Sequence, residues 1–220
     1  MRFGSNVLKW IKFASWTNAL VGFVIAHSVY LLMLFVTIPG VEQYSKGMDI
    51  FDMKATGYSS EYAQVLLETL GETGRSYYLT RQLPLDLIYP GVMALTWVLF
   101  ISLFVRRLDR RWGSLIIVPI VAAVFDYLEN GTIVAMLVTF PNVQESLAAL
   151  SSTFTIVKSM VSLFNFAIVS VLFLLYLYKL VQSRRSARTG KNKSFSKGDV
   201  NGSDPSVTRT EKISNHDYHS

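Results

Sequence analysis

Residues 114–140 constrain the fold of this chain more than any other stretch, because they form a long and almost entirely apolar run. At about 1.5 Å per residue, a helix of this length crosses the roughly 30 Å hydrocarbon core of a bilayer. The run also lacks the glycine and proline clusters that would divide it into short strands and turns. It therefore predicts a membrane-spanning helix.

Polar side chains interrupt this apolar run near its centre, at Asp126, Glu129 and Asn130. Their i, i+3, i+4 spacing places all three on one face of a helix. An ionisable side chain in hydrocarbon costs at least a few kcal/mol, so it turns toward protein or water and needs a partner. The same face continues through the mostly small residues Pro119, Ala122, Ala123 and Ile133. We interpret it as the face that turns into a helix bundle.

The composition agrees with a multi-span membrane protein. Of the 220 residues, 51% are hydrophobic and the mean hydropathy is +0.35, with the apolar residues gathered in long runs rather than dispersed. The net charge of +6 comes from basic residues beside these runs, where such residues set topology, and we predict no nucleic-acid partner. The absence of cysteine excludes disulfides, a thiolate nucleophile and cysteine metal ligands.

Four apolar runs predict an all-α fold, a bundle of four transmembrane helices at about residues 13–38, 84–105, 114–140 and 156–178. The membrane domain covers residues 13–181. Residues 1–12 are a short basic N-terminus, and the first run lacks a clear cleavage site, so we expect it to remain as a span. Residues 182–220 are polar and rich in Ser, Lys, Asn and Gly, which predicts a disordered basic tail.

Residues 41–83 form the long polar connection between the first two spans. Within it an apolar stripe recurs at helical spacing and predicts a short amphipathic helix, with Ser60 as N-cap and Gly71 as its end. A second helical turn over residues 75–80 and, as a weaker alternative, a strand over 46–54 are also considered. The stripe is expected to pack on the membrane surface or on the mouth of the bundle, and it consists of Tyr62, Val65, Leu66, Thr69 and Leu70.

The basic residues predict the orientation in the membrane. The N-terminus, the connection 106–111 and the near part of the tail contain 13 Lys and Arg residues, whereas the connection 41–83 on the opposite side contains four. By the positive-inside rule, both termini are cytoplasmic and residues 41–83 lie outside. The sequence does not distinguish the plasma membrane from an endomembrane.

This arrangement predicts two contacts between helices, a hydrogen bond and an ion pair. Pro90 lies within the second span and lacks an N–H group, so it should leave a backbone carbonyl near Asp86 without its helical partner. Asn130 can donate to that carbonyl, and Lys158 can reach about 6 Å inward to pair a carboxylate of the third span.

Four ordered motifs resemble a family of small four-span integral membrane proteins to which no activity is assigned. They are GxxGRxxY from Gly71, LPLDxxYP from Leu83, PxxAxxxDxxEN from Pro119 and FTxxK from Phe154. The similarity covers roughly residues 58–175. The resemblance implies a four-span fold and draws attention to the same polar residues, but it implies no reaction.

The predicted site is a buried polar cluster, formed by His27, Asp86, Asp126, Glu129, Asn130 and Lys158, with Arg75 and Arg81 at its mouth. Three interpretations remain open. The cluster is a structural network that fixes helix register, a site that binds or transports a proton, a cation or a small amphiphile, or the acid–base centre of a membrane-embedded enzyme acting on a lipid or isoprenoid.

Other classes of function have no support in the sequence. There is no nucleophile elbow, phosphate-binding loop or dinucleotide fingerprint, and no cofactor is predicted. No metal site is predicted either, because the acids and His27 lack a known ligand spacing. Membrane lipids are the expected partners, and a homo-oligomer is compatible with the chain, since a full alternating-access transporter of four spans would need a dimer.

Overall fold

The computed structural model describes residues 14–198, with side chains described as far as Arg185. Every regular element in this range is helical. Four continuous helical segments are long and apolar enough to cross a membrane: Trp16–Ser45, Ser60–Arg107, Arg110–Thr139 and Glu145–Arg185. The prediction of an all-α fold with four such helices is confirmed. The predicted N-terminus, residues 1–12, and residues 199–220 of the predicted tail lie outside the described residues.

The first segment is longer than predicted. Helix α2 (Trp16–Leu32) passes through a π-helical turn (Met33–Thr37) into α3 (Ile38–Ser45), and Lys46 ends α3 in the left-handed conformation, with φ of 52°. The predicted end at residue 38 falls next to Pro39, but the helix does not stop there. Pro39 lies in the first turn of α3, where a proline is tolerated because its missing N–H is not needed.

The connection between the first two spans contains the predicted amphipathic helix. Helix α4 (Ser60–Tyr77) is capped by Ser59, whose side chain accepts a hydrogen bond from the Tyr62 N–H at 3.1 Å, so the prediction of Ser60 as N-cap is wrong by one residue. Gly71 interrupts the helix with φ of 60°, a conformation that favours glycine. The chain remains helical beyond it through Tyr78–Gln82, and residues 46–54 form a 3₁₀ turn (Phe51–Met53) rather than a strand.

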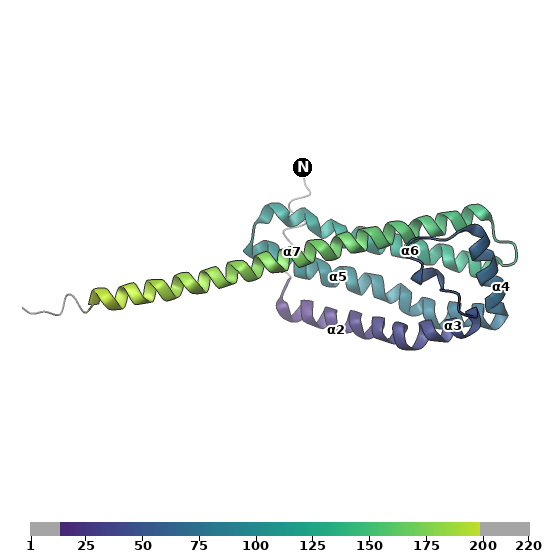
Figure 1. Cartoon of the computed structure of the whole chain (residues 1–220), viewed down its shortest axis with the longest axis horizontal. Helices are drawn as coiled ribbons and strands as arrows, with labels where there is room; N and C mark the ends of the chain where they lie inside the picture. Colours follow the sequence, from purple (N-terminus) through teal and green to yellow (C-terminus); the bar gives the residue numbers. More distant parts are fainter. Residues whose placement is uncertain (1–13, 199–220) are drawn as a thin grey trace, which may run out of the picture. The chain divides into compact units, whose positions relative to one another are not determined.

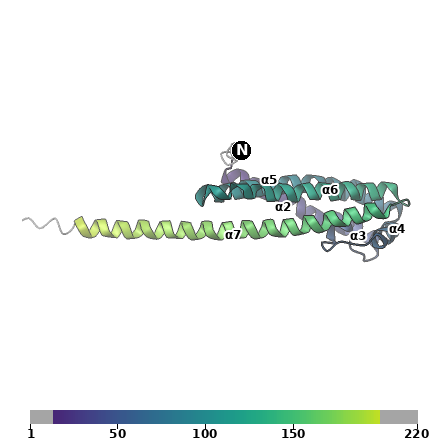
Figure 2. The same ribbon diagram turned by 90° about the horizontal axis from the view of Figure 1, so that it is seen from above.

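The remaining helices complete the bundle. They are α5 (Leu83–Arg107), α6 (Ile117–Thr139), which follows a 3₁₀ segment (Arg110–Ile116), and α7 (Glu145–Gly198). Figure 1 shows α2, α5 and α6 side by side with the first part of α7, and Figure 2 shows the same helices from above. Small residues allow α2 to approach α5 closely, since a Cβ on Gly22 would lie 2.6 Å from Thr96 Oγ1.

Helix α4 packs on the bundle through a face slightly different from the predicted one. Leu66 and Leu70 are buried as expected, but Val65 is 45% exposed. Ala63 and Leu67 are buried in its place, and they join a hydrophobic cluster with Ile133, Met136 and Leu137 of α6 and Ala148 of α7. The docking of α4 on the bundle mouth is confirmed, with the buried stripe rotated by about one residue.

The first part of the tail that was predicted to be disordered is helical and belongs to α7. Residues 184–198 continue the helix, although they are polar. An existing helix propagates readily into residues such as Arg, Lys and Ala because nucleation is already complete. Residues 178–198 belong to a compact unit of their own, in which Gln182 Nε2 donates to the Tyr178 hydroxyl at 2.7 Å.

Candidate functional site

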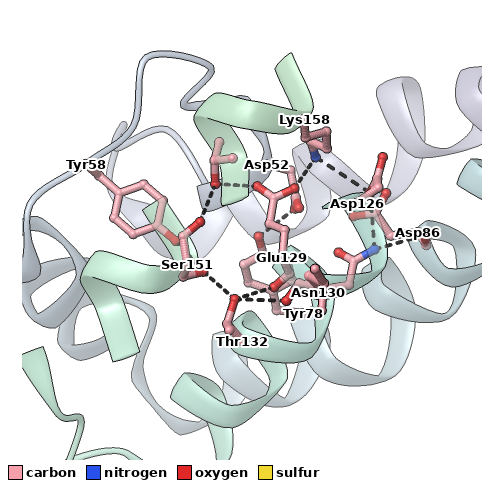
Figure 3. A network of polar contacts seen from close by, with 12 residues as sticks. Asp52, Tyr58, Tyr78, Asp86, Asp126, Glu129, Asn130, Thr132, Ser151 and Lys158 are labelled. Atoms are coloured by element: carbon pink, nitrogen blue, oxygen red, sulfur yellow. Dashed lines mark hydrogen bonds and ion pairs between the residues drawn. The ribbon is translucent and has the colours of Figure 1, made fainter. Parts of the chain in front are cut away.

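An ion-paired cluster lies between α6 and the first part of α7. Lys158 of α7 contacts the carboxylate of Glu129 and lies 3.7 Å from Asp126 Oδ1 (Figure 3). The Glu129 side chain is fully buried, whereas those of Asp126 and Lys158 each retain 14% exposure. The i, i+3 spacing that put both acids on one face of α6 thus brings them to the same lysine, and the predicted pairing of Lys158 with a carboxylate is confirmed.

Glu129 is the more completely enclosed of the two acids. In addition to the Lys158 contact, its Oε1 atom accepts a hydrogen bond from the Thr155 hydroxyl at 2.6 Å. Thr155 is itself buried on α7, one turn before Lys158. Both contacts join the Glu129 carboxylate of α6 to side chains of α7.

Asn130 closes the gap that Pro90 leaves in α5. Its Nδ2 atom donates to the Asp86 carbonyl at 3.0 Å, the carbonyl that the ring nitrogen of Pro90 cannot satisfy four residues later (Figure 3). The same amide nitrogen lies 3.4 Å from Asp126 Oδ1. The predicted use of Asn130 is confirmed, and this side chain joins α5 and α6 at the level of the acids.

Asp52 and Tyr78 belong to the cluster but were missed in the sequence. The Tyr78 hydroxyl donates to Asp52 Oδ2 at 2.6 Å, while Asp52 Oδ1 and Asp86 Oδ2 are buried without a hydrogen-bond partner among the described residues. Asp52 interacts electrostatically with Asp86, Asp126, Glu129 and Lys158. It comes from the polar connection, where no helical periodicity indicates a buried position, so no sequence signal pointed to it.

Hydroxyl groups extend the network on the other side of Glu129. Thr132 Oγ1 lies 2.8 Å from Ser151 Oγ and 2.7 Å from the Glu129 carbonyl, and the Tyr58 hydroxyl donates to Ser151 Oγ at 2.8 Å. The Tyr58 N–H donates to Ser152 Oγ, also at 2.8 Å. Burial raises the pKa of Tyr58, so the phenol stays protonated and acts as a donor. These bonds fasten the connection 46–59 to α7.

Three predicted site residues do not join the cluster. His27 lies on α2, where its Nδ1 atom is 2.9 Å from the Phe23 carbonyl and its ring stacks on Phe23 at 3.8 Å between centroids. Arg75 donates to the Leu67 carbonyl at 2.8 Å and lies over the Phe140 ring, so it ties the end of α4 to the end of α6. Arg81 is exposed. His27 lies apart from the predicted cluster because α2, which carries it, packs against α5 rather than α6.

A cleft of about 210 Å³ lies beside Asp126, between α5, α6 and α7. Its walls are mostly apolar, and the small residues of the predicted α6 face, Pro119, Ala122 and Ala123, provide much of its space. Asp126 supplies a carboxylate to this wall, and Asn165 of α7 supplies an amide whose buried Oδ1 atom has no hydrogen-bond partner among the described residues. The other lining residues are Tyr89, Pro90, Met93, Ala94, Trp97, Ser162 and Phe166.

No three acid, histidine or cysteine side chains within the described residues are grouped so that they could hold a metal ion. Comparison with protein families, with curated proteins and with solved structures finds no match for this chain. The resemblance to a four-span family therefore stays a prediction.

Proposed function

We propose that this protein is a multi-pass membrane protein that binds a small amphiphile in the cleft between α5, α6 and α7, with Asp126 as its polar anchor. The observation that carries the proposal is one carboxylate set in an otherwise mostly apolar cleft. Pockets of this composition, with few polar groups in an apolar wall, are typical of sites for small molecules. The polar groups fix orientation while the apolar wall supplies affinity.

The position of the cleft supports a ligand that arrives from the bilayer. Its lining residues fall at positions 89–97 of α5 and 119–126 of α6, within the apolar length of both helices. Met93, Ala94, Ala122 and Ala123 are partly exposed, and Phe166 is 61% exposed. Partly exposed side chains on membrane-spanning helices face lipid, so an amphiphile could enter without crossing a polar surface.

The size of the cleft limits the ligand. A volume of about 210 Å³ is below the roughly 300–1,000 Å³ of pockets that enclose drug-sized molecules. It has room for a small head group and part of one chain. We therefore propose a single-chain amphiphile, with the rest of its chain in the surrounding bilayer.

The two acids then have different roles. Glu129 holds Lys158 and Thr155 and does not line the cleft, whereas Asp126 lines the cleft and has the longer contact with Lys158. A membrane-embedded enzyme using this acid pair would need both groups at the substrate, because one must give a proton and the other take one. With one of the pair enclosed, binding is favoured over acid–base catalysis.

We further propose the predicted orientation, with both termini in the cytoplasm and residues 41–83 outside. The distribution of basic residues supports it. In this orientation, the cluster of Asp52, Tyr78 and Asp86 lies toward the outer side, and the cleft extends from Asp126 toward the inner side.

The test is co-purification. The protein is isolated in a mild detergent, and its bound amphiphiles are identified by mass spectrometry for the wild type, for Ala123→Phe, which fills the cleft, and for Val138→Phe. Val138 is 65% exposed on the same helix, so Val138→Phe introduces the same aromatic side chain outside the cleft. Ala94→Phe fills the opposite wall and serves if Ala123→Phe does not fold.

We expect a single-chain amphiphile bound in roughly stoichiometric amount to the wild type and to Val138→Phe, and its loss from the cleft-filling variant. The new phenylalanine side chain occupies the space of the cleft and removes no packing between helices, so the melting temperature of that variant should not fall by more than a few degrees. Equal amphiphile content in Ala123→Phe and wild type would refute the proposal.

A further inference from the structure

Two strong acceptors line the cleft, beside the hydroxyl groups of Tyr89 and Ser162 and the indole of Trp97, which can donate. Asp126 contributes a carboxylate, and the Oδ1 atom of Asn165 is buried without a hydrogen-bond partner, on a residue that is only 3% exposed. None of the described residues that line the cleft is Lys, Arg or His. Among the described residues of the lining, the charged side chain is therefore a carboxylate, so a cationic head group would meet an opposite charge and an anionic head group a like charge.

Aromatic rings line the same cleft. Tyr89 and Trp97 come from α5 and Phe166 from α7. The faces of aromatic rings attract ammonium groups, by about 0.5–2 kcal/mol depending on how far the cation is removed from water. A carboxylate combined with aromatic walls is the arrangement that proteins use to bind organic cations.

The cluster behind Asp126 carries more acid than base. Within the part of the chain that the structure describes, Lys158 is the one ammonium in contact with the acids, and Asp52, Asp86 and Asp126 all interact electrostatically with it in addition to Glu129. Lys158 makes its closest contact with Glu129, which leaves Asp126 the more weakly paired carboxylate at the cleft. A second cation beside Asp126 would offset the surplus of acid, whereas an anion would add to it.

We infer that the head group bound in this cleft is an ammonium, so that the ligand class is a single-chain alkylamine or a similar long-chain base. Its N–H groups donate to the Asp126 carboxylate and to Asn165 Oδ1, its charge lies against the rings of Tyr89 and Trp97, and its chain leaves past Phe166 into the bilayer. This inference rests on the proposed function and specifies its ligand.

The experiment compares three probes of equal chain length on the full-length protein in detergent: decylamine, which is cationic at neutral pH, decanol, which is neutral, and decanoate, which is anionic. Binding is measured below the critical micelle concentration by displacement of a photoreactive alkyl probe. A hydrogen-bonded charge pair predicts that decylamine binds at least about tenfold more tightly than decanol, and that decanoate binds most weakly.

Variants then test whether the preference for decylamine arises in the cleft. Asp126→Asn keeps size and shape but removes the charge, so it should reduce the preference for decylamine over decanol to about twofold or less. Asn165→Leu removes the second acceptor and should weaken decylamine while leaving decanol nearly unchanged. Val138→Phe should leave all three affinities as in the wild type.

The outcomes separate this inference from the proposed function. If decanol or decanoate binds as tightly as decylamine, and Ala123→Phe abolishes that binding, the cleft binds amphiphiles but the ammonium inference is wrong. If Ala123→Phe changes the binding of none of the probes, the proposed function itself fails. The wild-type comparison of the three probes decides the head group even if a variant does not fold.

Discussion

Removing Lys158 should destabilise this protein more than removing either of its acidic partners. The variant Lys158→Met keeps the length of the side chain but leaves Glu129, which is fully buried, without a charged partner. Removing one member of a buried ion pair typically costs about 3–5 kcal/mol, because the remaining charge cannot regain its hydration. For a protein of this size that corresponds to a fall of about 6–20 °C in melting temperature.

A second change should recover most of that loss. In Lys158→Met combined with Glu129→Gln, the buried pair is replaced by two neutral side chains, and the glutamine Oε1 atom can still accept the hydrogen bond that Thr155 now donates at 2.6 Å. Replacing a buried pair by neutral groups of similar volume is often neutral or stabilising. We expect the double variant to melt within about 5 °C of the wild type, well above Lys158→Met alone.

The assay is thermal unfolding in detergent, followed by intrinsic fluorescence of the tryptophans, of which the chain has four. Lys179→Met is the matched control, because it removes the same charge from an exposed position on the same helix. Its free energy of unfolding should change by no more than about 1 kcal/mol, with a correspondingly small shift in melting temperature. A double variant that melts as low as Lys158→Met, or a Lys158→Met that melts like the control, would refute the reasoning.

Three further predictions test the packing of the connection 41–83 and the proposed orientation. Leu66→Asp puts a carboxylate at a fully buried position of α4 and should lower the free energy of unfolding by at least about 2 kcal/mol. Val65→Asp, at an exposed position of the same helix, should lower it by less than about 1 kcal/mol. Equal melting temperatures of the two variants would contradict the docking of α4. Tyr58→Phe removes the hydrogen bond to Ser151 and should lower stability by about 1 kcal/mol in the same assay. Glu61→Cys introduces a single thiol into a cysteine-free chain, and a membrane-impermeant maleimide should label this thiol in intact cells. If the thiol is labelled only after the cells are lysed, the proposed orientation is wrong.

The sequence alone determined the features that depend on one helix at a time. The apolar runs predicted four helices able to span a membrane, and the spacing of Asp126, Glu129 and Asn130 predicted one buried face. Two contacts between helices were also predictable, the bond from Asn130 to the Asp86 carbonyl and the pairing of Lys158 with an acid. In each case the sequence shows a group that requires a partner: a backbone carbonyl without its N–H group, and a charge in an apolar segment. Few side chains nearby could provide that partner.

The tertiary structure decided which elements meet and at what rotation. It brought Asp52 and Tyr78 from the connection 41–83 to the acids, and it left His27 against Phe23 on a helix that packs elsewhere. It also separated a fully enclosed Glu129 from an Asp126 that lines a cleft. Helical periodicity gives the relative angle of side chains around their own axis, because backbone geometry is local. The rotation of one helix against another and the path of a connecting segment depend instead on packing summed over the whole bundle.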